Sequence, residues 1–249
     1  MRSARKIAKS GFYHVVTKGE ADKTLFFDNA DREFYLNELG RVRDELPLLI
    51  RAYCFMSNHA HFLLEDKQLC LAKAMKQLNE RYAWYFQRRM NRTGHVFKNR
   101  YWSEPVENEA YLLYAMRYIH ANPAAAGICE ALDYPWSSVQ DYLGHKGITD
   151  TDLILDMLGG RKGFIAFSLQ EPLRANPFPG SQLTQHQTTD ELATVAQSVI
   201  GDPAKLRTLP YGERRKRVRL MEQRGFSATE IARLSGVSRS TVYSDLTDA

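Results

Sequence analysis

The sequence has few of the features that mark special protein classes. Only three of its 249 residues are cysteines, Cys54, Cys70 and Cys129, and none are spaced as C-x-x-C, so we expect reduced thiols in a cytoplasmic protein. No apolar run approaches the roughly 18 residues of a membrane span, and the basic first residues lack the apolar core of a secretory signal. The net charge of +5 is compatible with a polyanionic partner but does not establish one.

What the sequence does contain is a series of short apolar segments that alternate between strand and helix periodicity. Helices interspersed among antiparallel strands favour an α+β fold over a doubly wound sheet. The expected strands are 11–19, 47–58, 59–65 and one near 97–106; the expected helices are 30–46 with Asp31 at its N-cap, 69–91, and 108–123 closed by Pro123.

The composition changes after this region and predicts three parts. Residues 170–190 are rich in Pro, Gln, Thr and Asn and have few large apolar residues, which is typical of a linker. The expected organisation is therefore one α+β domain over 1–169, the linker, and a small all-α module over 191–249.

Two histidines in the third expected strand suggest a site. Strict alternation in "HAHFLLE" predicts that His59, His61 and Leu63 lie on one face of the sheet. Ala60, Phe62 and Leu64 then lie on the other face. Two imidazoles on one strand face can bind a single divalent metal ion. The alternative is a pair of core histidines satisfied by hydrogen bonds, and the pattern alone does not exclude it.

The helix at 108–123 supplies possible partners. Tyr111, Tyr114, Tyr118 and Asn122 recur at spacings of three and four, so they share one stripe. The Asn122 amide, expected to project past the helix end, is a reasonable metal ligand. A tyrosine beside the metal would suit nucleophilic attack on a phosphate, although tyrosines on such a helix usually pack in the core.

Three blocks in order resemble a known family. "AYCFMSNHAHFLL" at 52–64, "YLLYAMRYIHANPAAAG" at 111–127 and "DYPWSSVQDYLG" at 133–144 are similar to the single-tyrosine HUH transposases, and more narrowly to the REP-associated tyrosine transposases. The resemblance covers roughly residues 10 to 145. It implies the HUH nuclease fold, a ferredoxin-like antiparallel sheet with packed helices.

The resemblance also implies roles for individual residues. His59 and His61 match the metal-binding pair, Asn122 matches the residue that completes the site for Mg²⁺ or Mn²⁺, and Tyr118 matches the nucleophile. The implied activity is metal-dependent cleavage and rejoining of single-stranded DNA through a 5′-phosphotyrosine, at hairpin-forming repeats. One departure is visible: the family usually continues Asn-Pro-Val-Arg-Ala, whereas Asn122-Pro123 is followed here by three alanines, which removes one candidate phosphate contact.

Two basic segments are candidate DNA contacts, because arginine binds phosphate and interleaved aromatics can stack on unpaired bases. The first is 88–102, an expected loop that begins at the end of the helix at 69–91. The second, at 214–246, resembles a helix-turn-helix. It has a Ser227–Glu230 capping box, an apolar helix face with Ile231, a turn at Gly236 and an inward-facing Val242. The candidates are Arg88, Arg89, Arg92, Lys98 and Arg100 in the first segment, and Arg214, Arg215, Arg217, Ser238, Arg239, Ser240 and Thr241 in the second.

Other interpretations stay open from the sequence. A DNA-binding regulator with an inactive HUH domain would need only the helix-turn-helix. A metal phosphohydrolase would use water and leave Tyr118 dispensable. We expect a single-stranded or hairpin DNA partner, no membrane association and a monomer, with the oligomeric state uncertain.

Overall fold

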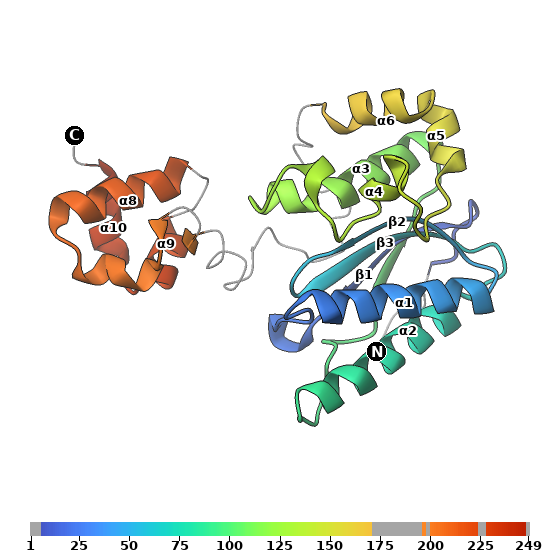
Figure 1. The fold of residues 1–249 in the computed structure, drawn as a ribbon, viewed down its shortest axis with the longest axis horizontal. Coiled ribbons are helices and arrows are strands. Elements are labelled where there is room, and N and C mark those ends of the chain that lie inside the picture. Colours follow the sequence, from blue (N-terminus) through green and yellow to red (C-terminus); the bar gives the residue numbers. More distant parts are fainter. Residues whose placement is uncertain (1–5, 171–195, 198–199, 224–227, 248–249) are drawn as a thin grey trace. The chain divides into compact units, whose positions relative to one another are not determined.

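The structure is a computed structural model that describes residues 6–170, 196–197, 200–223 and 228–247, with some side chains of the last two stretches left undescribed. The chain divides into two compact units. Among the described residues the larger unit falls within 6–125 and 129–170, and the smaller one within 126–128 and 196–247 (Figure 1). The predicted linker at 170–190 lies outside the described residues, apart from Gln170.

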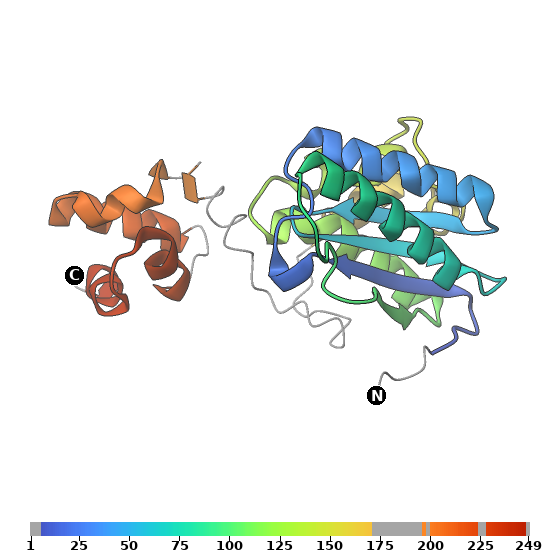
Figure 2. The same cartoon turned by 90° about the horizontal axis from the view of Figure 1, so that it is seen from below.

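A four-stranded antiparallel sheet forms the centre of the larger unit, with strand order β2-β3-β1-β4. Figure 1 shows α1 and α2 on one face of the sheet and α3 to α6 on the other, and Figure 2 shows α1 and α2 side by side. The predicted α+β, ferredoxin-like fold is confirmed. The elements are β1 (Phe12–Lys18), α1 (Asn29–Glu45), β2 (Leu49–Phe55), β3 (His59–Glu65), α2 (Leu71–Arg89), β4 (Trp102–Pro105), α3 (Glu109–Ala125), α4 (Val139–Tyr142), α5 (Asp152–Leu158) and α6 (Arg161–Ser168).

The main core lies between the sheet and the helices α1 and α2. Ala60, Phe62 and Leu64 belong to this core and pack with aromatic side chains such as Tyr35 and Tyr82 from the two helices. Burial of such large aromatic side chains contributes much of the stabilising free energy of a small core. The intervening residues of β3 therefore face the opposite side, toward α3, as the alternation predicts.

The N-cap of α1 differs from the prediction. Asp28, not Asp31, caps the helix: its carboxylate accepts a hydrogen bond from the backbone N–H of Asp31 at 3.2 Å. Asp31 lies in the first turn, where its buried carboxylate accepts from Phe27 N–H at 2.8 Å and pairs with Arg89 of α2. Asp31 therefore serves as the buried partner of Arg89 on α2 and not as the helix cap. This contact is distant in the sequence, so the local pattern could not predict it.

The prediction that Pro123 closes α3 is wrong. Pro123 lies inside the helix, which continues to Ala125. A proline cannot donate to the carbonyl four residues earlier, which here belongs to Ile119. The Asn122 side-chain amide lies 3.4 Å from that carbonyl and donates to the Tyr118 carbonyl at 2.8 Å. Asn122 thus folds back along its own helix and supplies donors where the backbone lacks one.

The block "YPWSS" at 134–138 lies along the free edge of β2. Phe55 N–H donates to the Trp136 carbonyl at 2.9 Å, and Ser138 N–H donates to the Tyr53 carbonyl at 3.0 Å. The Tyr134 hydroxyl donates to the Phe55 carbonyl at 2.7 Å. These bonds satisfy backbone groups that an edge strand would otherwise expose, so this block protects the sheet edge.

The smaller unit is all-helical, with its own apolar core. The predicted inward positions Ile231 and Val242 are fully buried, and Gly236 makes the turn between the last two helices with a φ of +66°. Ser227 and the Glu230 side chain lie outside the description, so their capping box stays a prediction. The elements are η4 (Pro203–Thr208), α8 (Tyr211–Gln223), α9 (Ala228–Ser235) and α10 (Arg239–Thr247).

A buried ion pair joins α8 to α10. Arg214 Nε lies 2.7 Å from Oδ2 of Asp245, whose side chain is fully buried. Replacing Arg214 by Met would leave that carboxylate without its cation, which typically costs about 3 kcal/mol or more. We expect calorimetry of the full chain to show earlier unfolding of the smaller unit in Arg214→Met. Lys216→Met is the matched control, because Lys216 is exposed; equal effects of the two changes would contradict a structural role for the pair.

Candidate active site on the α3 face of the sheet

The register of β1 against β3 brings a third histidine to the predicted pair. Lys18 lies opposite His59 and Val16 opposite His61 in this antiparallel ladder. Opposite residues share a face, and so do residues two apart on one strand. His14 of β1 therefore faces α3 together with both predicted histidines.

His14 and His61 form a direct hydrogen bond. Nε2 of His14 lies 3.0 Å from Nδ1 of His61, and the rings are almost parallel, with centroids 5.3 Å apart. Both side chains are fully buried. Burial lowers the pKa of His14 to about 3, and burial followed by the proximity of His59 and His14 lowers the pKa of His61 well below its usual value. Both imidazoles are therefore neutral at physiological pH, the state that binds metal ions.

His59 is held by the residue before it. Its Nδ1 lies 2.6 Å from Oδ1 of the buried Asn58, and its ring centroid is 4.9 Å from that of His61. A carbonyl oxygen only accepts hydrogen bonds, so Nδ1 of His59 is the donor. A hydrogen bond of this type orients most metal-binding histidines in proteins.

Tyr118 of α3 stands over the histidines. Its ring centroid lies 5.8 Å from that of His61 and 5.9 Å from that of His14, and both contacts are edge-on. Burial raises the pKa of Tyr118 to about 12, so the phenol carries its proton at neutral pH. Burial, and after it the charge of Glu104 on β4, raises the pKa of Tyr111 to about 12.

Asn122 completes the group from one turn further along α3. Its amide nitrogen is engaged with the Tyr118 carbonyl, so its carbonyl oxygen is the atom available as a ligand. The Asn122 side chain also approaches the His61 ring and favours protonation there, although burial outweighs that effect on the pKa. The structure thus brings His59, His61, Tyr118 and Asn122 together, as predicted.

The donor set fits a divalent metal ion. Nε2 of His61 is buried and makes no hydrogen bond of normal geometry, although the Asn122 side chain approaches the ring. Among the described residues, no three His, Cys, Asp or Glu side chains gather as a metal centre. A site here would consequently depend on two imidazole nitrogens and the Asn122 oxygen.

Three residues next to the site were not predicted to lie there: His14, Asn58 and Trp102. The Trp102 ring of β4 lies edge-on to His14, with centroids 5.4 Å apart. The alternation in "GFYHVVTKG" could have placed His14 on the face of Val16 and Lys18. Which strand pairs with β1, and in which register, could not be read from that segment.

The first basic segment lies beside the end of the sheet that carries the candidate site. Lys98 N–H donates to the Lys18 carbonyl at 2.9 Å, and Phe97 pairs with Gly19 just beyond β1. Lys18 is the residue opposite His59. The chain that follows α2 is therefore positioned beside the candidate site, and Arg100 is exposed there.

The arginines of this segment have different surroundings. Arg88 is exposed and its guanidinium lies 4.4 Å from the ring centre of Trp84, which is 59% exposed. Arg89 instead pairs with Asp28 and Asp31 and ties α2 to the start of α1. Arg92 donates to the His95 carbonyl at 3.2 Å. Arg88 is thus more accessible to a ligand than Arg89, and the DNA roles of all of them stay predictions.

The candidates in the smaller unit also differ. Arg214 is engaged with Asp245, and Arg217 donates to the Ile200 carbonyl at 2.8 Å, so both stabilise the unit itself. The Ser238 hydroxyl accepts from Thr241 N–H at 3.1 Å and caps α10, and Ser240 is exposed beside it. Two buried guanidinium nitrogens of Arg215 have no hydrogen-bond partner. The Arg239 side chain lies outside the description.

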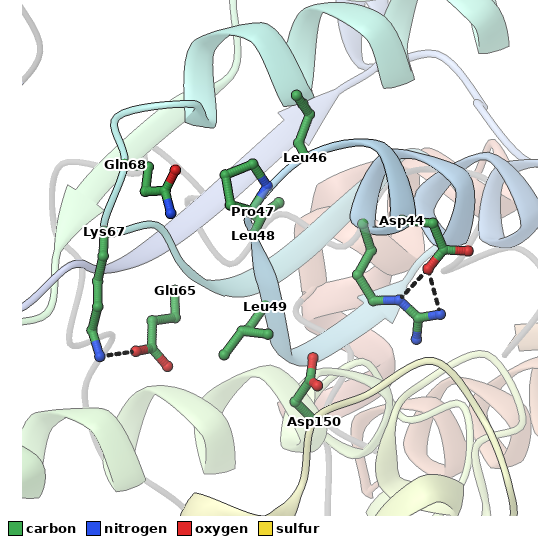
Figure 3. Close-up of a pocket in the computed structure, with 10 residues that line it drawn as sticks. Asp44, Leu46, Pro47, Leu48, Leu49, Glu65, Lys67, Gln68 and Asp150 are labelled. Atoms are coloured by element: carbon green, nitrogen blue, oxygen red, sulfur yellow. Dashed lines mark hydrogen bonds and ion pairs between the residues drawn. The ribbon is translucent and has the colours of Figure 1, made fainter.

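A pocket of about 540 Å³ lies at the opposite end of the strands, away from the histidines. It is lined by Leu49, which begins β2, and by Glu65, which ends β3, whereas His59 begins β3. Figure 3 shows Glu65 paired with Lys67 at its wall. Arg51 also holds the Glu65 carboxylate, at 2.5 Å. This pocket is separate from the candidate active site.

The comparisons with known proteins agree with this geometry. The family described as "Transposase IS200 like" matches residues 8–122. A solved structure described as the REP-associated tyrosine transposase bound to a REP hairpin superposes with a TM-score of 0.51, at 14% identity, over 60% of this chain and 94% of that one. At this identity the likeness concerns the fold.

Two further searches found nothing. The search of curated proteins found no match. Among the described helices, none has both the length and the apolar character needed to cross a bilayer.

The family match spans β1 to α3 and includes every residue of the candidate site. Residues 8–122 of this chain therefore match the IS200-like transposase family.

Proposed function

We propose that this protein cleaves and rejoins single-stranded DNA through a covalent 5′-phosphotyrosine on Tyr118. The observation that supports the proposal best is the position of the Tyr118 ring, 5.8 Å from His61, within the domain that matches a transposase family. A phenol beside neutral, metal-competent imidazoles is the arrangement that tyrosine attack on a phosphodiester requires.

The chemistry assigns one role to each group. The Tyr118 oxygen attacks the scissile phosphorus, a bond forms between them, and the bond from phosphorus to the 3′ oxygen breaks. The phenol proton leaves Tyr118 during attack, and the departing 3′ oxygen takes up a proton. The reverse reaction, with the 3′-hydroxyl of another strand as nucleophile, restores Tyr118 and rejoins the DNA without an external energy source.

His59, His61 and Asn122 would hold the Mg²⁺ or Mn²⁺ ion that this activity needs. When bound, such an ion supplies Lewis-acid stabilisation of the charge that develops on the phosphate. The protein's own contribution is to keep the His61 imidazole neutral by burial and to orient His59 through Asn58. Asn122 adds an oxygen ligand from α3, one turn from the nucleophile.

We infer that the DNA partner is a single strand with a hairpin. The solved structure with the similar fold is bound to a REP hairpin, and here a basic segment returns beside β1 next to His59. Arg88, Arg92, Lys98 and Arg100 are the proposed phosphate contacts of that segment. The exposed Ser240 at the start of α10, with Ser238, Arg239 and Thr241, would meet duplex DNA in the manner of a recognition helix.

The direct test is an adduct assay. The full chain is incubated with a labelled single-stranded hairpin DNA and Mn²⁺, and then denatured. We expect a protein–DNA species that survives denaturation and disappears with a chelator. Hairpin binding without any adduct would favour a DNA-binding regulator, and metal-dependent cleavage without an adduct would favour a hydrolase.

A truncation separates chemistry from affinity. A chain that ends at Gln170 keeps the hydrogen bond, 2.8 Å long, from the buried Arg117 to Gln170 and retains all site residues. We expect this truncated protein to form the adduct at high DNA concentration but to bind hairpin DNA more weakly than the full chain in a titration at fixed salt. A folded truncation that forms no adduct at any DNA concentration would contradict the division of roles.

A further inference from the structure

We propose that His14 and Asn58 are positioning residues that fix the protonated nitrogen of the two metal-binding histidines. The inference rests on the proposed metal site and adds two residues to it. His14 acts on His61 and Asn58 acts on His59, and in each case the contact is made at Nδ1. The Nε2 atoms are then the nitrogens directed to a metal ion.

Asn58 determines the state of His59 by its chemistry alone. Its Oδ1 has no hydrogen to donate, so at 2.6 Å the proton lies on Nδ1 of His59. A neutral imidazole with its proton on Nδ1 has a bare lone pair on Nε2. Asn58 is itself fixed, because it is buried and its backbone carbonyl accepts from Gly19 N–H at 2.8 Å.

His14 can determine the state of His61 in the same way. The nearly parallel rings share one proton across the 3.0 Å contact, so one nitrogen donates and the other accepts. If His61 binds a metal through Nε2, its proton must be on Nδ1, and Nε2 of His14 must be the acceptor. Nε2 of His61, which is buried and makes no hydrogen bond of normal geometry, is the atom that this arrangement would present to a metal ion.

The fold makes both positioning residues rigid. His14 lies on β1, which pairs with β3 on one side and β4 on the other, and Trp102 packs edge-on against its ring. A histidine that loses such an orienting partner can rotate or adopt the other protonation pattern. Loss of an orienting partner typically weakens metal binding 10–100-fold.

The test measures Mn²⁺ binding by calorimetry with the full chain and no DNA. His14→Leu removes the acceptor, whereas His14→Gln can place an amide oxygen near the position of Nε2. We expect about 10–100-fold weaker Mn²⁺ binding for His14→Leu and substantial recovery for His14→Gln. The same contrast is expected between Asn58→Leu and Asn58→Asp, which keeps the accepting oxygen.

A second readout does not depend on how well the variants fold. Long-range ¹⁵N–¹H spectra of the Mg²⁺-loaded wild-type protein identify the protonated nitrogen of each imidazole, and we expect Nδ1 for both His59 and His61. A proton on Nε2 of either residue would overturn the inference, and so would equal Mn²⁺ affinity of folded His14→Leu and wild type. A wild-type protein that binds no Mn²⁺ would instead remove the proposed metal site itself, and with it this inference.

Discussion

The Tyr118→Phe protein is expected to form no covalent adduct with hairpin DNA, while it binds the same DNA and Mn²⁺ almost as the wild type does. Only the hydroxyl is lost, and the ring contacts with His14 and His61 at 5.9 and 5.8 Å can persist, because phenylalanine keeps the ring. Denaturing electrophoresis measures the adduct, and equilibrium titrations measure the two affinities.

Tyr114→Phe and Tyr111→Phe are the matched controls, since both residues share the helix stripe. At a rise of about 1.5 Å per residue, the backbone of Tyr111 lies about 16 Å and that of Tyr114 about 12 Å from that of Asn122, compared with about 6 Å for Tyr118. Both controls should keep most of the activity. Mass spectrometry of the digested wild-type adduct should find the nucleotide on the peptide containing Tyr118; its presence on another tyrosine would overturn the assignment.

Alanine at His61 is expected to abolish adduct formation and to lower Mn²⁺ affinity by a factor of 10–100 or more. His59→Ala should have the same functional effect, since both imidazoles are proposed ligands. The two changes should differ in stability. His61 is fully buried and bonded to His14, whereas His59 is only half-buried, so His61→Ala should lose about 1–3 kcal/mol more in the free energy of unfolding.

Calorimetric Mn²⁺ titration and urea unfolding of the same samples measure both effects. His145→Ala is a suitable control, because His145 is exposed and lies outside the site. If His61→Ala stays folded and still forms the adduct at the wild-type rate, the metal proposal is wrong. If it loses stability and keeps its metal affinity, His61 is a core histidine and the site lies elsewhere.

The parts of this site that the sequence could predict are those that depend on periodicity within one element. Alternation along β3 was sufficient to put His59 and His61 on one face, and helical spacing put Tyr118 and Asn122 on one stripe. The inward positions Ile231 and Val242 of the smaller unit followed from the same reasoning. In each case the periodicity of one strand or helix determines which residues share a face.

The parts that could not be predicted depend on partners distant in the sequence. His14 meets His61 only because β1 lies between β3 and β4. Arg89 and Arg214 were predicted to contact DNA, but both form ion pairs within the protein. Arg89 pairs with Asp28 and Asp31 at the start of α1, and Arg214 pairs with Asp245 of α10. Pro123 would normally end a helix, but here the side-chain amide of Asn122 folds back on α3 and lies 3.4 Å from the Ile119 carbonyl, which loses its backbone donor at Pro123.

The position of the histidines on the two inner strands has a consequence for hydrogen exchange. β1 and β3 are flanked by β4 and β2, so their amide hydrogens exchange only when an outer strand detaches or the whole unit unfolds. The imidazoles therefore belong to the slowest-exchanging part of the molecule, whereas Tyr118 and Asn122 belong to a separate helix. A rearrangement that brings the nucleophile to DNA would then be a movement of α3 over a fixed sheet, visible as faster amide exchange in α3 than in β1 and β3.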